Sequence, residues 1–243
     1  MEFLDRFKQD FYINFIQEER WRYLVTGLGN TLKITSVAVL LGIAIGIVAA
    51  LVRTGWEQSR GELRGVPRLA LALANGLCRV YLAVIRGTPV VVQLMIMYYI
   101  IFASSRNGVA VAMLAFGINS GAYVAEIFRS GIQSIDISQL EAGRALGFSY
   151  AQTMRHIILP QALRNVLPAL ANEFITLLKE TSVAGYVTVR DLTMGGDIIR
   201  SVTYSPFLPL LAVALIYLVM VLLFTTLVEK LEERLRKGTK RGN

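Results

Sequence analysis

Residues 141–160 read EAGRALGFSYAQTMRHIILP and form a polar stretch between segments that are apolar enough to cross a membrane. Ser138 is placed to accept a backbone N–H as the N-cap of a short helix, and the Glu141 side chain can reach back to the N–H of Ser138. Gly147 adopts a left-handed conformation at low steric cost, which ends a helix. The pattern therefore predicts a helix of about two turns that begins near Gln139 and ends just before Gly147.

A second helix is predicted directly after this glycine. Ser149 and Gln152 repeat the capping pattern, and Pro160 fits the end of the helix because proline does not continue helical hydrogen bonding. Two capped helices joined by a glycine also describe a helix-turn-helix, which belongs to a soluble basic domain. The flanking residues 109–128 and 208–228 are suited to hydrocarbon. We therefore expect no nucleic-acid binding.

The same stretch resembles the Glu-Ala-Ala signature of bacterial ABC importer permeases. Glu141 and Ala142, Gly147 six positions after the glutamate, and the Ile-x-Leu-Pro ending at Pro160 match this signature. The stretch departs from it at Gly143, where a second alanine is preferred. Further motifs resemble the polar amino acid branch of the family, the histidine, glutamine and arginine type. They lie at residues 30–35, 86–89, 92–94, 119–123 and 172–174, and the resemblance extends over residues 27–233.

The resemblance implies an all-α, polytopic membrane protein of the type I ABC importer permease class. Such a protein has five transmembrane helices and a cytoplasmic coupling-helix insert, here residues 138–160. The resemblance also implies several partners: an ATP-binding ABC subunit in two copies, a second permease copy or a paralogue, an extracytoplasmic solute-binding protein, and a polar amino acid as substrate. No cofactor is expected, and the expected location is the bacterial inner membrane.

The composition agrees with a chain that lies in a lipid bilayer. Of its 243 residues, 54% are hydrophobic, and the mean hydropathy is +0.53, which exceeds the usual range of soluble domains. The net charge of +8 then carries topology information rather than marking an acidic ligand. The single cysteine, Cys78, excludes an intrachain disulfide, and the single histidine, His156, has no cysteine or carboxylate at metal-binding spacing, so no metal site is expected.

Residues 1–23 are predicted to form an amphipathic segment at the membrane interface. Leu4, Phe7, Phe11 and Phe15 recur at helical spacing with charged residues between them, which is typical of an interfacial helix. No cleavable signal peptide is expected, because these residues lack an apolar core.

Five membrane spans are predicted, at about residues 24–52, 80–102, 109–128, 166–189 and 207–228. Residues 53–68 have the character of a polar cytoplasmic loop, and a break is expected near residues 87–89. Gly42 and Gly46 form a small-xxx-small pair. This pair either lets a neighbouring helix approach closely or reflects the abundance of glycine in membrane helices.

Basic residues set the predicted orientation. The insert and the tail at residues 229–243 are rich in arginine and lysine, so both should be cytoplasmic. Two crossings must then lie between them, and residues 166–189 supply one although Glu173, Lys179 and Glu180 lie within it. A charged crossing is stable where it faces the interior of an assembly. The N-terminus is expected outside and the C-terminus in the cytoplasm.

Polar residues at membrane depth form the candidate substrate pathway. An amino acid carries an ammonium and a carboxylate, and each needs a partner once it is dehydrated. Glu173 would meet the ammonium, and Arg86 or Lys179 would meet the carboxylate. A structural pair of Lys179 with Glu173 or Glu180 is the alternative. The complete set is Asn119, Tyr123, Glu173, Thr176, Lys179, Glu180 and Arg86.

The insert supplies the candidate ATPase-coupling residues. Its apolar side chains need a groove to bury them, and the resemblance places that groove on the ATP-binding subunit. Glu141 is expected to act directly as the capping carboxylate. The candidate set is Glu141, Ala142, Gly143, Leu146, Gly147, Phe148 and Pro160.

The chain is not expected to be an enzyme. It contains no Gly-x-x-x-x-Gly-Lys-Ser/Thr loop, so the phosphate cradle of an ATPase is missing, and no catalytic residues are assigned. An ion-gradient-driven secondary amino acid transporter would use Glu126, Glu173 and Glu180 as ion carriers, but no inverted repeat is visible. A membrane scaffold without transport would leave the buried charges without a purpose. The sequence favours the permease over both.

Overall fold

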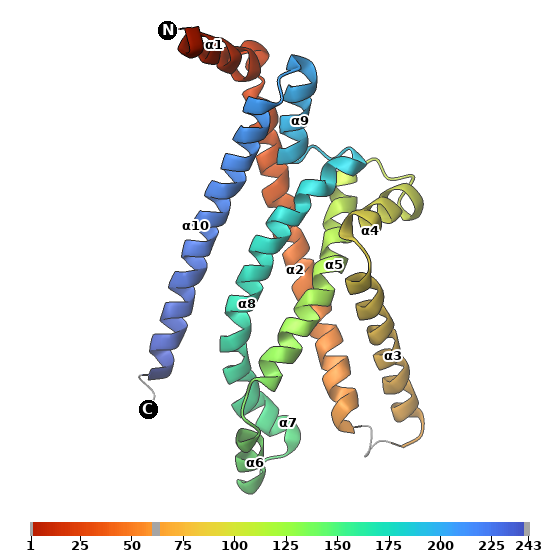
Figure 1. Ribbon diagram of the computed structural model, residues 1–243. Coiled ribbons are helices and arrows are strands. Elements are labelled where there is room, and N and C mark those ends of the chain that lie inside the picture. Colours follow the sequence, from red (N-terminus) through yellow and green to blue (C-terminus); the bar gives the residue numbers. More distant parts are fainter. Residues whose placement is uncertain (1, 60–63, 241–243) are drawn as a thin grey trace. The chain divides into compact units, whose positions relative to one another are not determined.

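The computed structural model describes residues 2–59 and 64–240 (Figure 1). Every regular element in these residues is helical, which confirms the all-α class. The α-helices are α1 Glu2–Phe11, α2 Trp21–Ser59, α3 Val66–Gly87, α4 Val90–Ile96, α5 Gly108–Gln133, α6 Ile137–Ala145, α7 Tyr150–Thr153, α8 Leu159–Glu180, α9 Leu192–Thr203 and α10 Phe207–Lys240. Shorter π-helical or 3-10 segments are η1 Tyr12–Ile16, η2 Gln17–Glu19, η3 Met97–Ile101, η4 Met154–Ile158 and η5 Thr181–Val187.

The chain divides into two compact units, each assembled from separate parts of the sequence. Unit 1 consists of Met1–Ala38, Pro89–Gly117 and Ile175–Thr225, and unit 2 of Val39–Thr88, Ile118–Phe174 and Thr226–Asn243. Helices α2, α5, α8 and α10 therefore contribute residues to both units.

Helices α2, α3, α5 and α10 are long and apolar enough to cross a membrane, as judged by length and composition. Helix α8 is 22 residues long but is not among the candidates found in the described part of the chain. It carries Arg164, Glu173, Lys179 and Glu180. The polytopic class is thus confirmed, and the number of crossings stays a prediction.

The predicted span at residues 80–102 is divided between two helices. The chain is helical from Val66 to Gly87, breaks, and resumes in α4. Thr88 is extended, with φ −127° and ψ 149°, because a proline disfavours helical geometry in the residue before it. Pro89 also donates no N–H. The break expected near residues 87–89 is confirmed.

Several other predicted boundaries move. Helix α2 continues to Ser59, so the first part of the predicted loop at residues 53–68 is helical, and residues 60–63 lie outside the described part. Helix α10 continues to Lys240, so the basic tail extends the last helix rather than forming a separate segment. Long arginine and lysine side chains can reach water from a helix end, which lets both helices run past their apolar parts.

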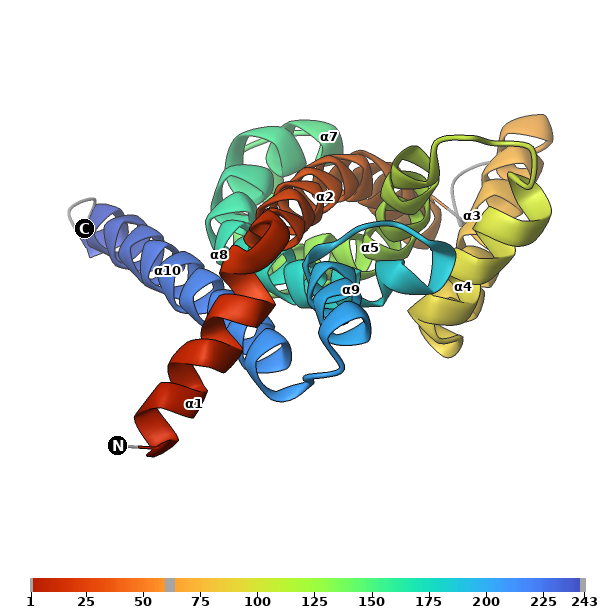
Figure 2. The ribbon, with the colours of Figure 1, turned by 90° about the horizontal axis from the view of Figure 1, so that it is seen from above.

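In unit 1 the N-terminal segment packs against α9 and the start of α10. Phe15 and Leu24 join Leu192, Ile199 and Leu208 in one apolar cluster. Phe15 is therefore buried, contrary to the amphipathic pattern, because its side chain lies in η1 rather than on α1. Figure 2 shows α1 running away from α9, and its apolar side chains are exposed: Leu4, Phe7 and Phe11.

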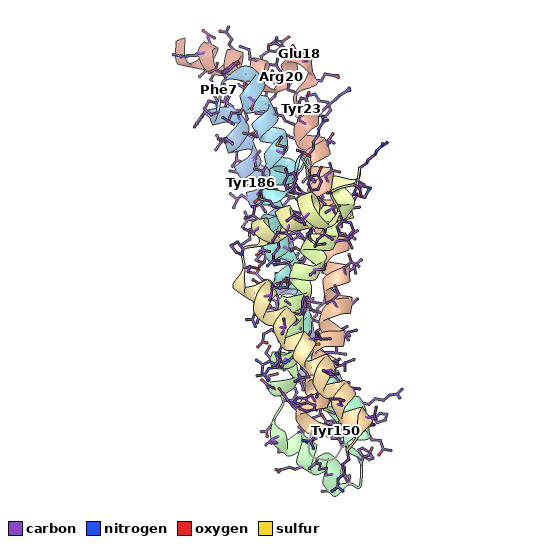
Figure 3. All side chains as sticks on the ribbon, turned by 90° about the vertical axis from the view of Figure 1, so that its right-hand side faces the viewer. Phe7, Glu18, Arg20, Tyr23, Tyr150 and Tyr186 are labelled. Atoms are coloured by element: carbon purple, nitrogen blue, oxygen red, sulfur yellow. The ribbon has the colours of Figure 1, made fainter. Side chains whose placement is uncertain are left out.

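A buried polar cluster fixes the same segment. The Asn14 amide is fully buried, donates to the Asp10 carbonyl at 2.7 Å and accepts from the Thr203 hydroxyl at 2.9 Å. Arg20 donates to the Ile13 carbonyl and pairs with Glu18 at 3.2 Å, two residues labelled in Figure 3. These bonds hold the turn between η1 and α2.

In unit 2, α2 packs closely on α5 through the glycine pair. A Cβ at Gly46 would lie 2.5 Å from Val124 Cγ1, and one at Gly42 would lie 2.8 Å from Ser120 Oγ. Real Cβ atoms do not approach other atoms so closely. The interpretation of these glycines as a close-approach site is confirmed. Helix α3 lies against the same pair through Tyr81, which donates to the Ile118 carbonyl at 2.6 Å.

Candidate functional site

The first helix of the insert begins two residues earlier than predicted, and its cap is a different side chain. The Asp136 carboxylate accepts the Ser138 N–H at 2.9 Å, and α6 starts at Ile137. The assignment of Ser138 as N-cap is therefore wrong, because its N–H is already engaged and Glu141 has no donor to reach. The Ser138 N–H lowers the pKa of the Asp136 carboxyl, so this cap is charged throughout the neutral pH range.

The predicted turn at Gly147 is confirmed. Gly147 has φ +80°, and its N–H donates to the Arg144 carbonyl at 2.9 Å while the Phe148 N–H donates to the Gly143 carbonyl at 3.0 Å. These two bonds form a Schellman motif, which satisfies carbonyls at the end of α6. A branched side chain is strained at this φ.

The second capping box is confirmed, and it leads into a close contact with α6. The Ser149 N–H donates to Gln152 at 2.8 Å and the Gln152 N–H to Ser149 at 3.3 Å. One residue later, Thr153 is fully buried. A Cβ at Gly143 would lie 2.7 Å from Thr153 Oγ1. The glycine that departs from the family signature is therefore required by the packing of α7 on α6.

Pro160 does not end the second helix, contrary to the prediction. The chain stays helical from α7 through the π-helical η4 and into α8, where Pro160 is the second residue. A proline donates no N–H, and a π-helical turn shifts the local hydrogen bonds by one residue. The insert is thus joined to α8 without a loop.

The outer surface of the insert includes three large exposed apolar side chains. Ile137 is 71%, Leu146 74% and Phe148 40% exposed. Glu141 and Ala142 are also exposed, whereas Gly143 is buried. Figure 3 shows the labelled Tyr150 at the end of unit 2 that carries the insert. An exposed apolar surface on a structured turn is typical of a docking site.

Within unit 2 the structure links two of the motifs noted in the sequence. The Ser120 hydroxyl donates to Glu173 Oε1 at 2.8 Å, which joins α5 to α8. Asn119, next to Ser120, is 2% exposed. Tyr123, one turn further along α5, is 36% exposed. A carboxylate thus lies between two helices with a hydroxyl already bound to it.

Two members of the candidate pathway, Arg86 and Tyr123, lie beside each other in the structure. The guanidinium carbon of Arg86 lies 5.9 Å from the Tyr123 ring centroid, and its NH1 lies 3.6 Å from Glu126 Oε2. Arg129 also binds Glu126, through Nε at 3.1 Å and through a second nitrogen. Glu126 therefore links α3 to α5. The candidate set did not include Glu126, although the i, i+3 spacing of Glu126 and Arg129 predicts an ion pair.

The remaining pathway candidates lie in unit 1, on the last turns of α8. Thr176 and Lys179 are exposed and Glu180 is half-buried. Lys179 interacts electrostatically with the neighbouring Glu180, and the structural pairing of these two residues stays a prediction.

The motif at residues 30–35 has a structural role in unit 1. The Asn30 amide donates to the Arg190 carbonyl at 2.8 Å, and Thr31 accepts the Leu192 N–H at 3.1 Å. Asp191 between them caps α9 by accepting the N–H groups of Thr193 and Met194, each at 3.0 Å. Among residues 2–59 and 64–240 no three His, Cys, Asp or Glu side chains gather as a metal site requires.

Comparison with known proteins agrees with this arrangement. Residues 68–237 match the family described as binding-protein-dependent transport system inner membrane component. The chain is 35% identical over 219 residues to the arginine transport system permease protein ArtQ of Bacillus subtilis (strain 168), covering 89% of this chain and 94% of that protein. It is 36% identical to the glutamine transport system permease protein GlnP of Escherichia coli (strain K12), covering 88% and 93%.

Solved structures lead to the same family. A crystal structure described as an amino acid ABC transporter with histidines superimposes with a TM-score of 0.79 and 39% identity, covering 90% of this chain and 98% of that one. Both the sequence match and the structural match span most of the chain. The chain therefore belongs to the family of inner membrane components of binding-protein-dependent transport systems.

Proposed function

We propose that this chain is the permease subunit of an ATP-driven importer for polar amino acids, which forms the translocation pathway and couples to a separate ATPase subunit. The observation that carries the proposal is the insert α6–α7. It is capped at its start, closed by a Schellman turn, and exposes Ile137, Leu146 and Phe148 on its outer surface, so it offers fixed apolar side chains to a groove in a partner. Relatives named for arginine and glutamine transport support an amino acid as the substrate.

The partners follow from this role. Two copies of the ATP-binding subunit receive the inserts of two permeases, the second of which is a copy of this chain or a paralogue. An extracytoplasmic solute-binding protein delivers the amino acid from the opposite side. The insert then faces the cytoplasm, with the N-terminus outside and the C-terminus inside. No comparable support exists for a secondary transporter.

Contacts inside unit 2 support transmission of movement from the insert to α8. The Asn165 amide donates to the Ser134 hydroxyl at 2.8 Å, and Gln161 donates to Gln139 on α6 at 3.5 Å. The helical connection through η4 has no flexible loop. A force applied to the insert therefore moves α8, which carries Glu173.

Glu173 is the residue that we assign to the solute. Its carboxylate accepts a hydrogen bond from the Ser120 hydroxyl, which places a negative charge where α8 meets α5. The ammonium or guanidinium of an amino acid is a suitable further donor at membrane depth, where an ionic group needs an opposite charge. Arg86 or Lys179 would meet the carboxylate of the solute; Arg86 exposes part of its side chain beside Tyr123.

Uptake into vesicles tests the function. The full complex, with its solute-binding protein, should accumulate arginine, histidine or glutamine only when ATP is supplied on the insert side. Collapse of the proton and sodium gradients by ionophores should leave uptake unchanged. Uptake that follows the ion gradient and ignores ATP would favour a secondary transporter instead.

The role of Glu173 is tested by Glu173→Gln, which removes the charge and keeps an acceptor for Ser120. We expect the amino acid concentration for half-maximal uptake to rise about tenfold, because one charged hydrogen bond contributes about 1.5 kcal/mol or more, with a normal yield of complex. Ser120→Ala is the matched control, since it removes the hydroxyl that donates to Glu173 but keeps the charge. If Glu173 is structural, Glu173→Gln should lower the yield and leave the apparent affinity near normal.

A further inference from the structure

An apolar groove lies between α2 and α3 in unit 2. It measures about 480 Å³, and Val48, Ala49, Leu77, Cys78 and Tyr81 are among its lining residues. Val48 is 61% and Leu77 73% exposed, so the groove is open on its outer side. The Tyr81 hydroxyl is bonded to the Ile118 carbonyl, so the tyrosine presents its ring to the groove. A ligand there has to be apolar over most of its length.

Arg53 stands at one end of this groove. It follows Ala49 by one helical turn on α2, and its guanidinium interacts electrostatically with the Cys78 thiol in the groove wall. Its Nε is buried and has no hydrogen-bond partner among the described residues. A buried donor without a partner costs free energy, so an acceptor is expected at this end.

The nearby carboxylates do not fill that need. Glu126 is within electrostatic range of Arg53, but its oxygens bind Arg129 and Arg86. Glu57, one turn beyond Arg53, is exposed and interacts electrostatically with Arg129. Among these groups of unit 2, the three arginines Arg53, Arg86 and Arg129 therefore face two carboxylates, which leaves one positive charge unmatched.

We propose that the groove binds a phospholipid with an anionic headgroup. One acyl chain lies against Val48 and Leu77, and the phosphate accepts a hydrogen bond from Arg53. Basic pockets between membrane helices at headgroup level are suited to such lipids. The groove lies on α2 and α3, both apolar enough to cross a membrane, so lipid surrounds it. A protein partner at this place would have to bring its own acidic side chain.

The bound lipid would hold α3 against α2. Only 11% of the apolar stretch of α3 is buried by other described residues. Tyr81 donates a hydrogen bond from α3 to α5. An acyl chain in the groove adds contacts where the protein leaves α3 exposed. The lipid belongs to the leaflet on the side of the insert, because Glu57 and Arg129 lie near each other at the ends of α2 and α5, and α6 follows the end of α5.

Cys78 allows a direct test, since it is the single cysteine of the chain. The full chain, with any subunits that copurify, is delipidated in detergent and alkylated with N-ethylmaleimide. The rate of alkylation at Cys78 is followed by mass spectrometry of the peptide that contains it. We expect phosphatidylglycerol to slow alkylation at a concentration about tenfold below that of phosphatidylcholine, since only the former carries net charge for Arg53.

Two variants separate the lipid site from general charge effects. Arg53→Gln should remove the preference for phosphatidylglycerol, whereas Arg79→Gln, an exposed arginine beside Cys78 on α3, should keep it. Native mass spectrometry should find about one fewer anionic lipid retained per chain in Arg53→Gln.

Several results would overturn the proposal. Equal protection by both lipids, or an unchanged preference in Arg53→Gln, would exclude a headgroup contact. Protection by inorganic phosphate alone would identify a plain anion site. An unreactive Cys78 in the delipidated protein would mean that protein, such as a second permease copy, covers the groove.

Discussion

Gly143 and Thr153 hold the two short helices of the insert at contact distance. Thr153 is fully buried, and its hydroxyl donates to the Ser149 carbonyl at 3.1 Å. An alanine at position 143 would bring its Cβ to 2.7 Å from Thr153 Oγ1. The glycine and the threonine therefore form a matched pair, and a change at one position should be corrected by a change at the other.

Gly143→Ala should destabilise the insert by about 1–3 kcal/mol, the usual cost of overpacking, although alanine favours a helix more than glycine does. Thr153→Ala removes the clashing atoms, so the double variant should recover the stability. The thermal midpoint of the complex and retention of the ATPase subunit measure both effects. Gly55→Ala, on α2 with no atom within 4 Å of the new Cβ, is the control. Additive losses in the double variant would refute this pairing.

Among the helices, the contact of α2 with α5 depends on small side chains. Gly42 and Gly46 on α2 face Ser120 and Val124 on α5. Apolar side chains gain little from association in lipid, so close packing itself holds such helices together. The hydrogen bond from Ser120 to Glu173 then adds α8 to this pair.

Gly46→Leu should separate α2 from α5 and lower the yield of folded complex, because even a Cβ there would lie 2.5 Å from Val124. Gly29→Leu, also on α2, is the control, since a Cβ at Gly29 has no atom within 4 Å. Detergent-stable yield and thermal midpoint are the measurements. If the two variants behave alike, the glycine pair is not a close-approach site.

For the chain as a whole, orientation in the membrane governs which partners it can meet. In the proposed function the insert faces the ATPase, and the charge distribution predicts a cytoplasmic position for it. Helix α8 is the further crossing that charge counting predicts, although it is not in the set that hydropathy identifies among the described residues.

Cysteine labelling checks this topology in a Cys78→Ala background. A cysteine at the exposed Asn107 should react with an impermeant reagent added outside the cell. Cysteines at Ser59 and Thr239 should react only after the membrane is permeabilised. If all three positions react from the same side, the five-span topology and the proposed orientation are both incorrect.

The sequence alone determined the features that depend on near neighbours. Gly147 ends α6, Ser149 and Gln152 cap the next helix, and the chain breaks at Pro89, because turns, caps and prolines act within a few residues. The apolar composition predicted the membrane class for the same reason, since each helix must bury its own backbone in lipid. Even here, Asp136 rather than Ser138 caps α6, because the Asp136 carboxylate accepts the N–H of Ser138 itself.

The tertiary structure alone decided which distant residues meet. Sequence periodicity gave no sign that Thr153 requires glycine at position 143, that Ser120 binds Glu173, or that Arg53 lies at the end of a groove. These contacts depend on how the helices dock, and docking depends on the shapes of surfaces far apart along the chain. The sequence also did not predict that the insert continues through Pro160 into α8. Residue preferences do not reveal a π-helical turn, which rearranges the backbone hydrogen bonds.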